Sequence, residues 1–101
     1  MPVQNNGTNG SGSTTIAQTG VVQNLVPSSI PCVRGDVRAY INNAGDIIVG
    51  GNGIQLSPVK GIPIHKDEVY NLDAVTDLFN VLIVGNAGDV IYWNWWTGYT
   101  S

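Results

Sequence analysis

Charged side chains are scarce in this sequence, and its N-terminal segment has none. Of the 101 residues, 11% are Asp, Glu, Lys or Arg, against about 25% in an average soluble domain. The first charged residue is Arg34, so residues 1–33 carry no charge. Seven acidic residues outnumber four basic ones, and the net charge is −3. Nucleic-acid-binding domains need a basic face, so the composition argues against this class and we expect no nucleic-acid partner.

Cysteine and histidine occur once each, as Cys32 and His65. A single cysteine excludes an intrachain disulfide and a cysteine-based zinc site, and a single histidine excludes a histidine cluster. Nothing in their spacing brings Cys32 and His65 together as a nucleophile and a base. No other set of acid, base and nucleophile can be named. We therefore expect no enzyme activity, no bound metal and no cofactor.

The sequence also lacks a long uninterrupted apolar run. Its most apolar stretch, residues 78–96, is broken by asparagine, glycine and aspartate, whereas a transmembrane helix needs about 20 predominantly apolar residues. The N-terminus shows neither the basic nor the apolar region of a secretion signal. We expect no membrane span, no membrane partner and synthesis in the cytoplasm of a cell.

Residues 1–31 are predicted to form an extended arm outside the folded domain. Residues 5–20 contain a single large apolar side chain, Ile16, which is too little to offset an ordering entropy of about 1–2 kcal/mol per residue. Residues 21–31 are more apolar, and their two prolines favour an extended chain. This second part is predicted to be an anchor that docks on a neighbouring subunit. Its expected contact residues are Val21, Val22, Leu25, Val26 and Ile30.

Residues 32–101 have the pattern of a β-domain. Apolar residues alternate loosely over 33–41, and no segment shows a sustained helical period. Further short apolar runs, separated by glycine, proline and polar residues, lie at 47–49, 54–56, 62–64, 69–72, 81–84 and 90–96. We predict an all-β fold, a small antiparallel β-sandwich or barrel-like domain with an extended N-terminal arm. Residues 73–79 are either a short helical turn or a loop.

The tetrapeptide Asn-Ala-Gly-Asp occurs twice, at 43–46 and at 86–89. Asparagine favours the start of a type I turn, and glycine in third place can adopt a positive φ, as in the common three-residue hairpin loop. We predict that each tetrapeptide closes a β-hairpin between its flanking strands. The duplication is either an internal repeat or one good turn used twice, and the sparse similarity around the copies favours the second reading.

Aromatic side chains are concentrated near the C-terminus. If residues 90–96 form a strand, Trp93 and Trp95 share one face, and Tyr92 and Trp96 share the other. One face is expected to fill the core. The other is expected to pack on a neighbouring subunit, because tryptophan and tyrosine are enriched at interface centres and so small a core needs support. A platform for sugar rings is the alternative. The candidate contact residues are Trp93, Trp95, Trp96 and Tyr99.

Four motifs follow one another in order between residues 25 and 96. They are a cysteine before a valine-containing strand (32–37), Ile-Val-Gly-Gly (48–51), Gly-Ile-Pro-Ile (61–64), and an apolar segment that includes the second Asn-Ala-Gly-Asp (75–90). This order resembles that of small bacteriophage virion proteins of the head-decoration or minor structural type. The family more often has Pro-Gly-Glu where this chain has residues 65–68, which changes a turn. The resemblance implies a β-sandwich-like fold and a place on the virion.

These observations together predict a bacteriophage structural protein that decorates or cements the capsid. We expect it to form a homo-oligomer, with a trimer favoured, and to dock its arm on the major capsid protein or on other virion subunits. The alternatives are a carbohydrate-binding host-attachment module of the virion and a head–tail joint protein.

Overall fold

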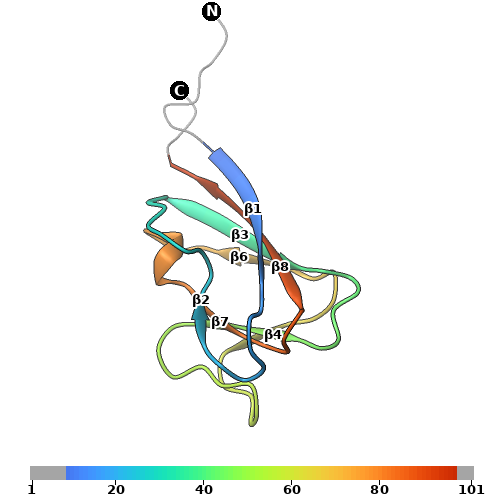
Figure 1. Cartoon of the computed structure of the whole chain (residues 1–101). Helices are drawn as coiled ribbons and strands as arrows, with labels where there is room; N and C mark the ends of the chain where they lie inside the picture. Colours follow the sequence, from blue (N-terminus) through green and yellow to red (C-terminus); the bar gives the residue numbers. More distant parts are fainter. Residues whose placement is uncertain (1–8, 98–101) are drawn as a thin grey trace, which may run out of the picture.

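The computed structural model describes residues 9–97, which form two packed antiparallel sheets and confirm the predicted small β-sandwich (Figure 1). The first sheet has the strand order β1 (Asn9–Thr15), β8 (Val90–Trp96), β3 (Arg34–Ala39) and β6 (Val69–Leu72). The second sheet has the order β2 (Gln23–Asn24), β7 (Leu82–Val84), β4 (Ile47–Gly50) and β5 (Ile62–Ile64). A short 3₁₀ turn, η1 (Leu78–Asn80), is the one helical element of the described residues, and no helix among them could cross a membrane.

The chain changes sheet at almost every connection. Among the described strands, only β4 and β5 follow each other within one sheet. The tetrapeptide at 43–46 leads from β3 to β4, and the one at 86–89 leads from β7 back to β8. The hairpin prediction is therefore wrong, because turn chemistry fixes only the local path of the chain. The partner of each strand is set by the apolar face that it has to bury.

The main core lies between the two sheets. Along β3 the buried positions alternate with exposed or half-buried ones, as the sequence pattern indicates. The buried members of this core are Ile16, Leu25, Val26, Cys32, Val37, Ala39, Ile47, Val49, Ile64, Leu72, Leu78, Ile83 and Ile91. Strands β3, β6 and β8 of the first sheet and β4, β5 and β7 of the second all contribute, so this core holds the two sheets together.

A second, smaller core lies on the other side of the second sheet. Ile48 and Val84 pack there with Ile54, and Leu56 and Leu82 cover them partly. Strand β4 is consequently buried on both faces, which explains why residues 47–49 form a continuous apolar run instead of an alternating one. The loop that carries Ile54 covers the outer face of the second sheet, whereas the first sheet presents polar side chains on its outer face.

Residues 9–31 are part of the sandwich, which differs from the predicted boundary at residue 31. Strand β1 pairs with β8 along its whole length, from Asn9 opposite Trp96 to Thr15 opposite Val90. The side chain that follows, Ile16, is 1% exposed and sits in the main core. The part of the predicted arm at residues 1–8 lies outside the described residues.

The small side chains of β1 match the bulk of β8. A Cβ atom on Gly12 would lie 2.5 Å from the Trp93 ring, and one on Gly10 would lie 2.7 Å from the Trp95 ring. Both distances are far shorter than a van der Waals contact, so only glycine leaves room for the two indoles. The glycines of this segment therefore accommodate a packed aromatic face, where their number had suggested a flexible arm.

Candidate interaction surfaces

The structure places the predicted anchor residues in different surroundings. Leu25 and Val26 are 0% and 1% exposed and fill the space between the sheets, so they contact this chain's own core and not a partner. Val21 and Val22 are 50% and 41% exposed and lie in the connection between β1 and β2. Ile30 is half-buried against the main core. Two of the five residues thus remain fully at the surface.

The tryptophans of β8 point to two faces, as the predicted alternation requires. Trp93 and Trp95 turn inward and pack against the main core. The indole N–H of Trp93 donates to the Thr14 hydroxyl at 3.0 Å, and this hydroxyl donates to the backbone carbonyl of Leu25. Trp93 therefore has a structural role at the margin of the sandwich. Tyr99 lies outside the described residues.

The outer face of the first sheet pairs aromatic rings with arginines. Trp96 lies directly opposite Arg34 in the register of β8 and β3, and Tyr92 lies opposite Arg38. The guanidinium carbon of Arg34 is 4.6 Å from the centre of the Trp96 ring, and that of Arg38 is 5.5 Å from the Tyr92 ring. Both distances fit cation–π contacts. Half of the chain's four basic residues are thus held on this face.

A hydrogen-bonded polar pair lies between the two aromatic pairs. The Asn94 amide donates to Oδ1 of Asp36 at 2.8 Å, and the two residues are opposite each other in the sheet. A shallow depression of about 610 Å³ opens over this part of the face, between β1 and β6. It combines hydroxyl, carboxylate, amide, guanidinium and aromatic groups, so it could hold a polar ligand.

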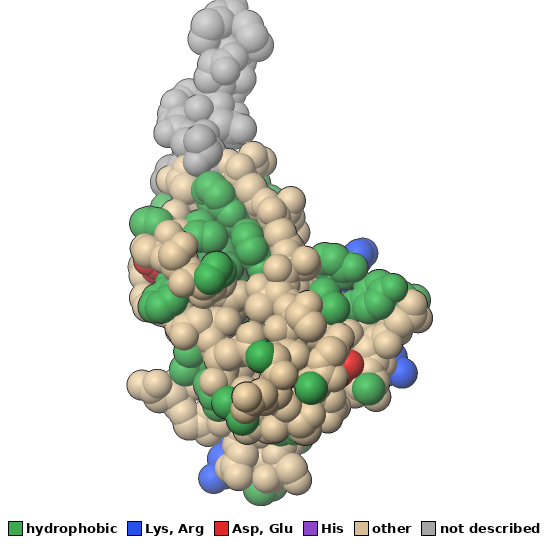
Figure 2. Space-filling model, viewed as in Figure 1, with side chains coloured by type: hydrophobic (Ala, Val, Ile, Leu, Met, Phe, Trp, Pro, Cys, Tyr) green, Lys and Arg blue, Asp and Glu red, His purple; other side chains and the backbone are tan. Residues whose placement is uncertain are grey.

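The free edge of β1 is the second candidate surface. Within the described part of the chain, β1 pairs with β8 alone, and its opposite edge has no neighbouring strand. Strand β1 is seven residues long and contains neither a charge nor a proline. Figure 2 shows the strip over β1 without basic or acidic side chains. An edge of this kind is a template for an additional strand.

The other three sheet edges are protected in recognisable ways. Strand β2 has two residues and β5 has three, one of which is Pro63. Strand β6 is preceded by Asp67 and Glu68 and followed by Asp73. Short length, proline and charge each discourage the pairing of edges. The edge of β1 is therefore the one least protected against addition of a strand.

An apolar groove runs beside β1. It has a volume of about 450 Å³ and lies between β1 and the segment that contains β2. Val26, Pro27 and Phe79 form much of its wall, and Phe79 is 37% exposed. Figure 2 shows hydrophobic side chains gathered next to β1 in the upper half of the view. An added strand could place side chains here.

A second groove of about 440 Å³ opens at the other side of the sandwich, between β4 and β6. The loop at 73–81 closes one end of it. In this loop Asp77 accepts hydrogen bonds from the Ser29 hydroxyl, from the Phe79 N–H at 2.9 Å and from the Ile30 N–H at 2.8 Å. The bond from Ser29 and the two backbone bonds lower the pKa of Asp77. This carboxylate is therefore occupied in holding the loop.

The two Asn-Ala-Gly-Asp turns lie side by side and satisfy each other's backbone. The Asn43 side chain donates to the Val90 carbonyl at 2.9 Å and accepts from the Val90 N–H at 2.8 Å. The Asp89 carboxylate accepts from the N–H groups of Ala44 at 2.8 Å and Gly45 at 3.2 Å. Asn43 and Asp89 are the buried polar side chains of the described residues. Their hydrogen bonds hold together the two connections that lead from one sheet to the other.

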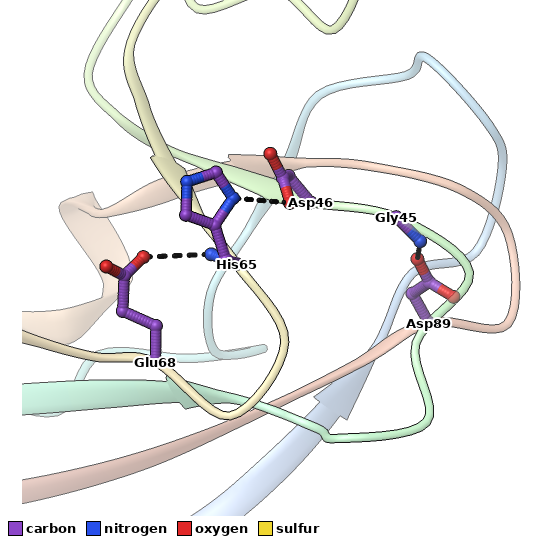
Figure 3. A network of polar contacts seen from close by, with 5 residues as sticks. All are labelled: Gly45, Asp46, His65, Glu68 and Asp89. Atoms are coloured by element: carbon purple, nitrogen blue, oxygen red, sulfur yellow. Dashed lines mark hydrogen bonds and ion pairs between the residues drawn. The ribbon is translucent and has the colours of Figure 1, made fainter.

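Asp46, which ends the first Asn-Ala-Gly-Asp turn, contacts His65, the only histidine of the sequence (Figure 3). Nδ1 of His65 lies 2.8 Å from Oδ1 of Asp46, and the His65 N–H donates to Glu68 at 2.9 Å. The bond with Asp46 raises the pKa of His65. Both side chains are substantially exposed, at 65% and 38%. The contact ties two surface turns together.

No metal site or reactive thiol emerges from the described residues. Among residues 9–97, no group of three or more His, Cys, Asp or Glu side chains is placed to hold a metal ion. Burial raises the pKa of the Cys32 thiol, which keeps it protonated at neutral pH. Comparison of the chain with protein-family models, curated proteins and solved structures finds no match. The functional proposal therefore depends on the surfaces above and on the motif order.

Proposed function

We propose that the protein is a structural subunit of a bacteriophage virion that associates with neighbouring subunits through the free edge of β1. The observation that carries the proposal is the contrast between this edge, which is long, uncharged and without proline, and the three protected edges. The motif order over residues 25–96, which resembles that of phage decoration and minor structural proteins, supports the virion as the place of assembly.

The contact is made by adding one strand of a neighbour to the first sheet. Backbone N–H and C=O groups of β1 supply the hydrogen bonds, and the groove formed by Val26, Pro27 and Phe79 receives side chains of the incoming strand. Because β1 carries no charge, no ion loses its hydration when the strand is covered. A symmetric shell repeats the contact in every subunit, so a modest gain per copy stabilises the whole particle.

This mechanism revises the predicted role of the N-terminal segment. Leu25 and Val26 hold the chain's own sheets together, and β1 with the exposed Val21 and Val22 remains for contacts between subunits. The proposal thus keeps the N-terminal segment as the assembly element, but as an edge strand of the domain.

Two lysines on β1 test the proposal. Asn9→Lys with Thr15→Lys adds charge at exposed positions of the edge strand, and Asn52→Lys with Val59→Lys adds the same charge at exposed positions of the loop between β4 and β5. We expect sedimentation analysis to show concentration-dependent association of the wild-type and control proteins, and a monomer for the β1 variant. Wild-type and control proteins should also be found in purified particles of the phage that encodes the chain, unlike the β1 variant. A monomeric wild-type protein, or a β1 variant that enters particles normally, would contradict the proposal.

A further inference from the structure

The outer face of the first sheet carries a complete row of polar side chains that the core does not use. Ser11, Asn94, Asp36 and Asn71 lie opposite one another across β1, β8, β3 and β6. All four side chains end in hydrogen-bonding groups. A row of this kind runs across four neighbouring strands, on the face turned away from the main core, and has acceptors and donors in a fixed order.

The neighbouring row has a different chemistry. It contains Ser13, Tyr92, Arg38 and Val69, again in register across the four strands. The row thus places an aromatic ring and a guanidinium next to an apolar side chain. The depression of about 610 Å³ spans both rows, since its lining includes Ser11, Ser13, Asp36, Arg38, Tyr92 and Asn94. This volume lies within the range of small-ligand sites, about 300–1,000 Å³.

Several polar atoms in this depression are oriented and still available. The bond between Asn94 and Oδ1 of Asp36 fixes both side chains. Among the contacts of residues 9–97, Oδ2 of Asp36 and the side-chain carbonyl of Asn94 have none. The Arg38 guanidinium reaches Asp67 only at 3.9 Å, and its side chain is 54% exposed. A ligand would therefore meet the acceptors of Asp36 and Asn94, which their mutual bond holds in place, and the largely exposed Arg38 donor beside them.

We infer that this depression binds a neutral carbohydrate chain. Hydroxyl groups on adjacent carbons both donate and accept, which matches a carboxylate, an amide and a guanidinium within one site. The C–H face of a sugar ring would contact the Tyr92 ring beside the Arg38 guanidinium, whose central carbon lies 5.5 Å from the ring centre. Asp36 and Arg38 have opposite charges, so the centre of the site does not select a charged ligand. The inference is independent of the association through β1.

Other ligand classes fit the same face less well. A nucleic-acid backbone would meet the Asp36 carboxylate and a chain of net charge −3. A protein partner would be expected to need large apolar side chains at the centre of the contact, whereas the centre of this face is the Asp36–Asn94 pair. Trp93 and Trp95 pack partly against the main core, so this site relies on the ring of Tyr92, whereas the alternative drawn from the sequence placed the sugar platform on the tryptophans.

The test begins with the wild-type protein on an array of neutral and acidic glycans. We expect binding to at least one neutral glycan, followed by titration of that glycan with the amide signals of Asp36, Arg38 and Asn94 shifting first in NMR spectra. Absence of binding to every neutral glycan would overturn the inference. Binding restricted to acidic glycans and abolished by salt would also overturn it, because charge alone would then explain the interaction.

Variants then locate the site. Asp36→Asn, and separately Asn94→Ala, should weaken binding roughly tenfold or more, because each removes an oriented group from the ligand. Asp73→Asn is the matched control, since Asp73 is an exposed carboxylate outside the depression. Circular dichroism checks that each variant is folded. Equal affinity of Asp36→Asn and the control would refute the site. The monomeric β1 variant keeps all the named residues and should bind like wild type, which separates this outcome from that of the assembly proposal.

Discussion

Replacement of Asn43 by alanine should destabilise the protein strongly although Asn43 lies in a turn. Its side chain is 3% exposed and forms two hydrogen bonds with the backbone of Val90, one as donor and one as acceptor. Alanine removes both bonds and leaves the Val90 N–H without a partner, whereas the Val90 C=O keeps its bond from the Tyr40 N–H at 3.0 Å. The strand β8 begins at this residue, so the start of an interior strand of the first sheet loses two of its attachments.

The expected size of the effect follows from one orphaned N–H and one lost hydrogen bond to a carbonyl that keeps another partner. An unsatisfied buried donor costs about 1–3 kcal/mol, and a hydrogen bond contributes about 0.5–1.5 kcal/mol net. Because Val90 is only half-buried, water can reach part of the vacated space, and we expect a total loss of about 2 kcal/mol, from the lower part of both ranges. A domain of this size has a free energy of unfolding of about 5–15 kcal/mol, so the loss is a large fraction of it.

Asn86→Ala is the matched control, because Asn86 occupies the same place in the second tetrapeptide. Among the hydrogen bonds of residues 9–97, none involves the Asn86 side chain, and its loss should cost less than about 0.5 kcal/mol. Urea denaturation, monitored by tryptophan fluorescence, measures the free energy of unfolding of both variants. The midpoint temperature of thermal unfolding should fall by roughly 4–8 °C for each kcal/mol lost. Equal stabilities of the two alanine variants would refute the reasoning that the turns support each other through Asn43.

Two further predictions follow from the packing of β1 and from the surface turns. Gly12→Ala should lower stability by about 1–3 kcal/mol and shift the Trp93 fluorescence, because the new methyl group overlaps the indole; Gly51→Ala, where nothing lies within 4 Å, should change neither. The bond with Asp46 raises the pKa of His65 from 6.5, so the contact stabilises the fold below pH 6.5 and stops doing so as the pH rises through the raised pKa. The urea concentration at the unfolding midpoint should therefore fall more, as the pH rises through the raised pKa, in wild type than in Asp46→Asn. An equal pH dependence of the midpoint in the two proteins would argue against the contact.

Most strands after residue 33 could be predicted because their signal is local; the exception is the apolar run at 54–56, which forms no strand and instead carries Ile54 into the second core. The apolar runs at 62–64 and 69–72 coincide with β5 and β6. The alternation over 90–96 correctly separated the inward Trp93 from the outward Tyr92. In each case the residues that form a strand also carry the pattern that identifies it.

The role of β1 could not be predicted because the interaction that orders it is distant in sequence. Thr14 bonds to Trp93, which is 79 residues further along the chain. Composition alone indicates the conformational entropy that β1 loses when it becomes ordered. It does not reveal the aromatic face of β8 against which β1 packs. The alternation of glycine with serine over residues 9–13 was the available signal, since it leaves one face of a strand empty. The pairing of Asp36 with Asn94 also depends on the register of β3 and β8, which the sequence does not specify.

The position of β8 between β1 and β3 imposes an order on synthesis and assembly. Strand β8 comes long after β1 in the chain, so a growing polypeptide holds β1 without its partner until residues 90–96 have been made. Folding depends on this late, long-range pairing and should be slow compared with that of a domain rich in local contacts. The edge proposed for association is then created only when β8 has paired with β1. A chain truncated before Val90 would present no such edge, so the proposed association would be restricted to chains that contain β8.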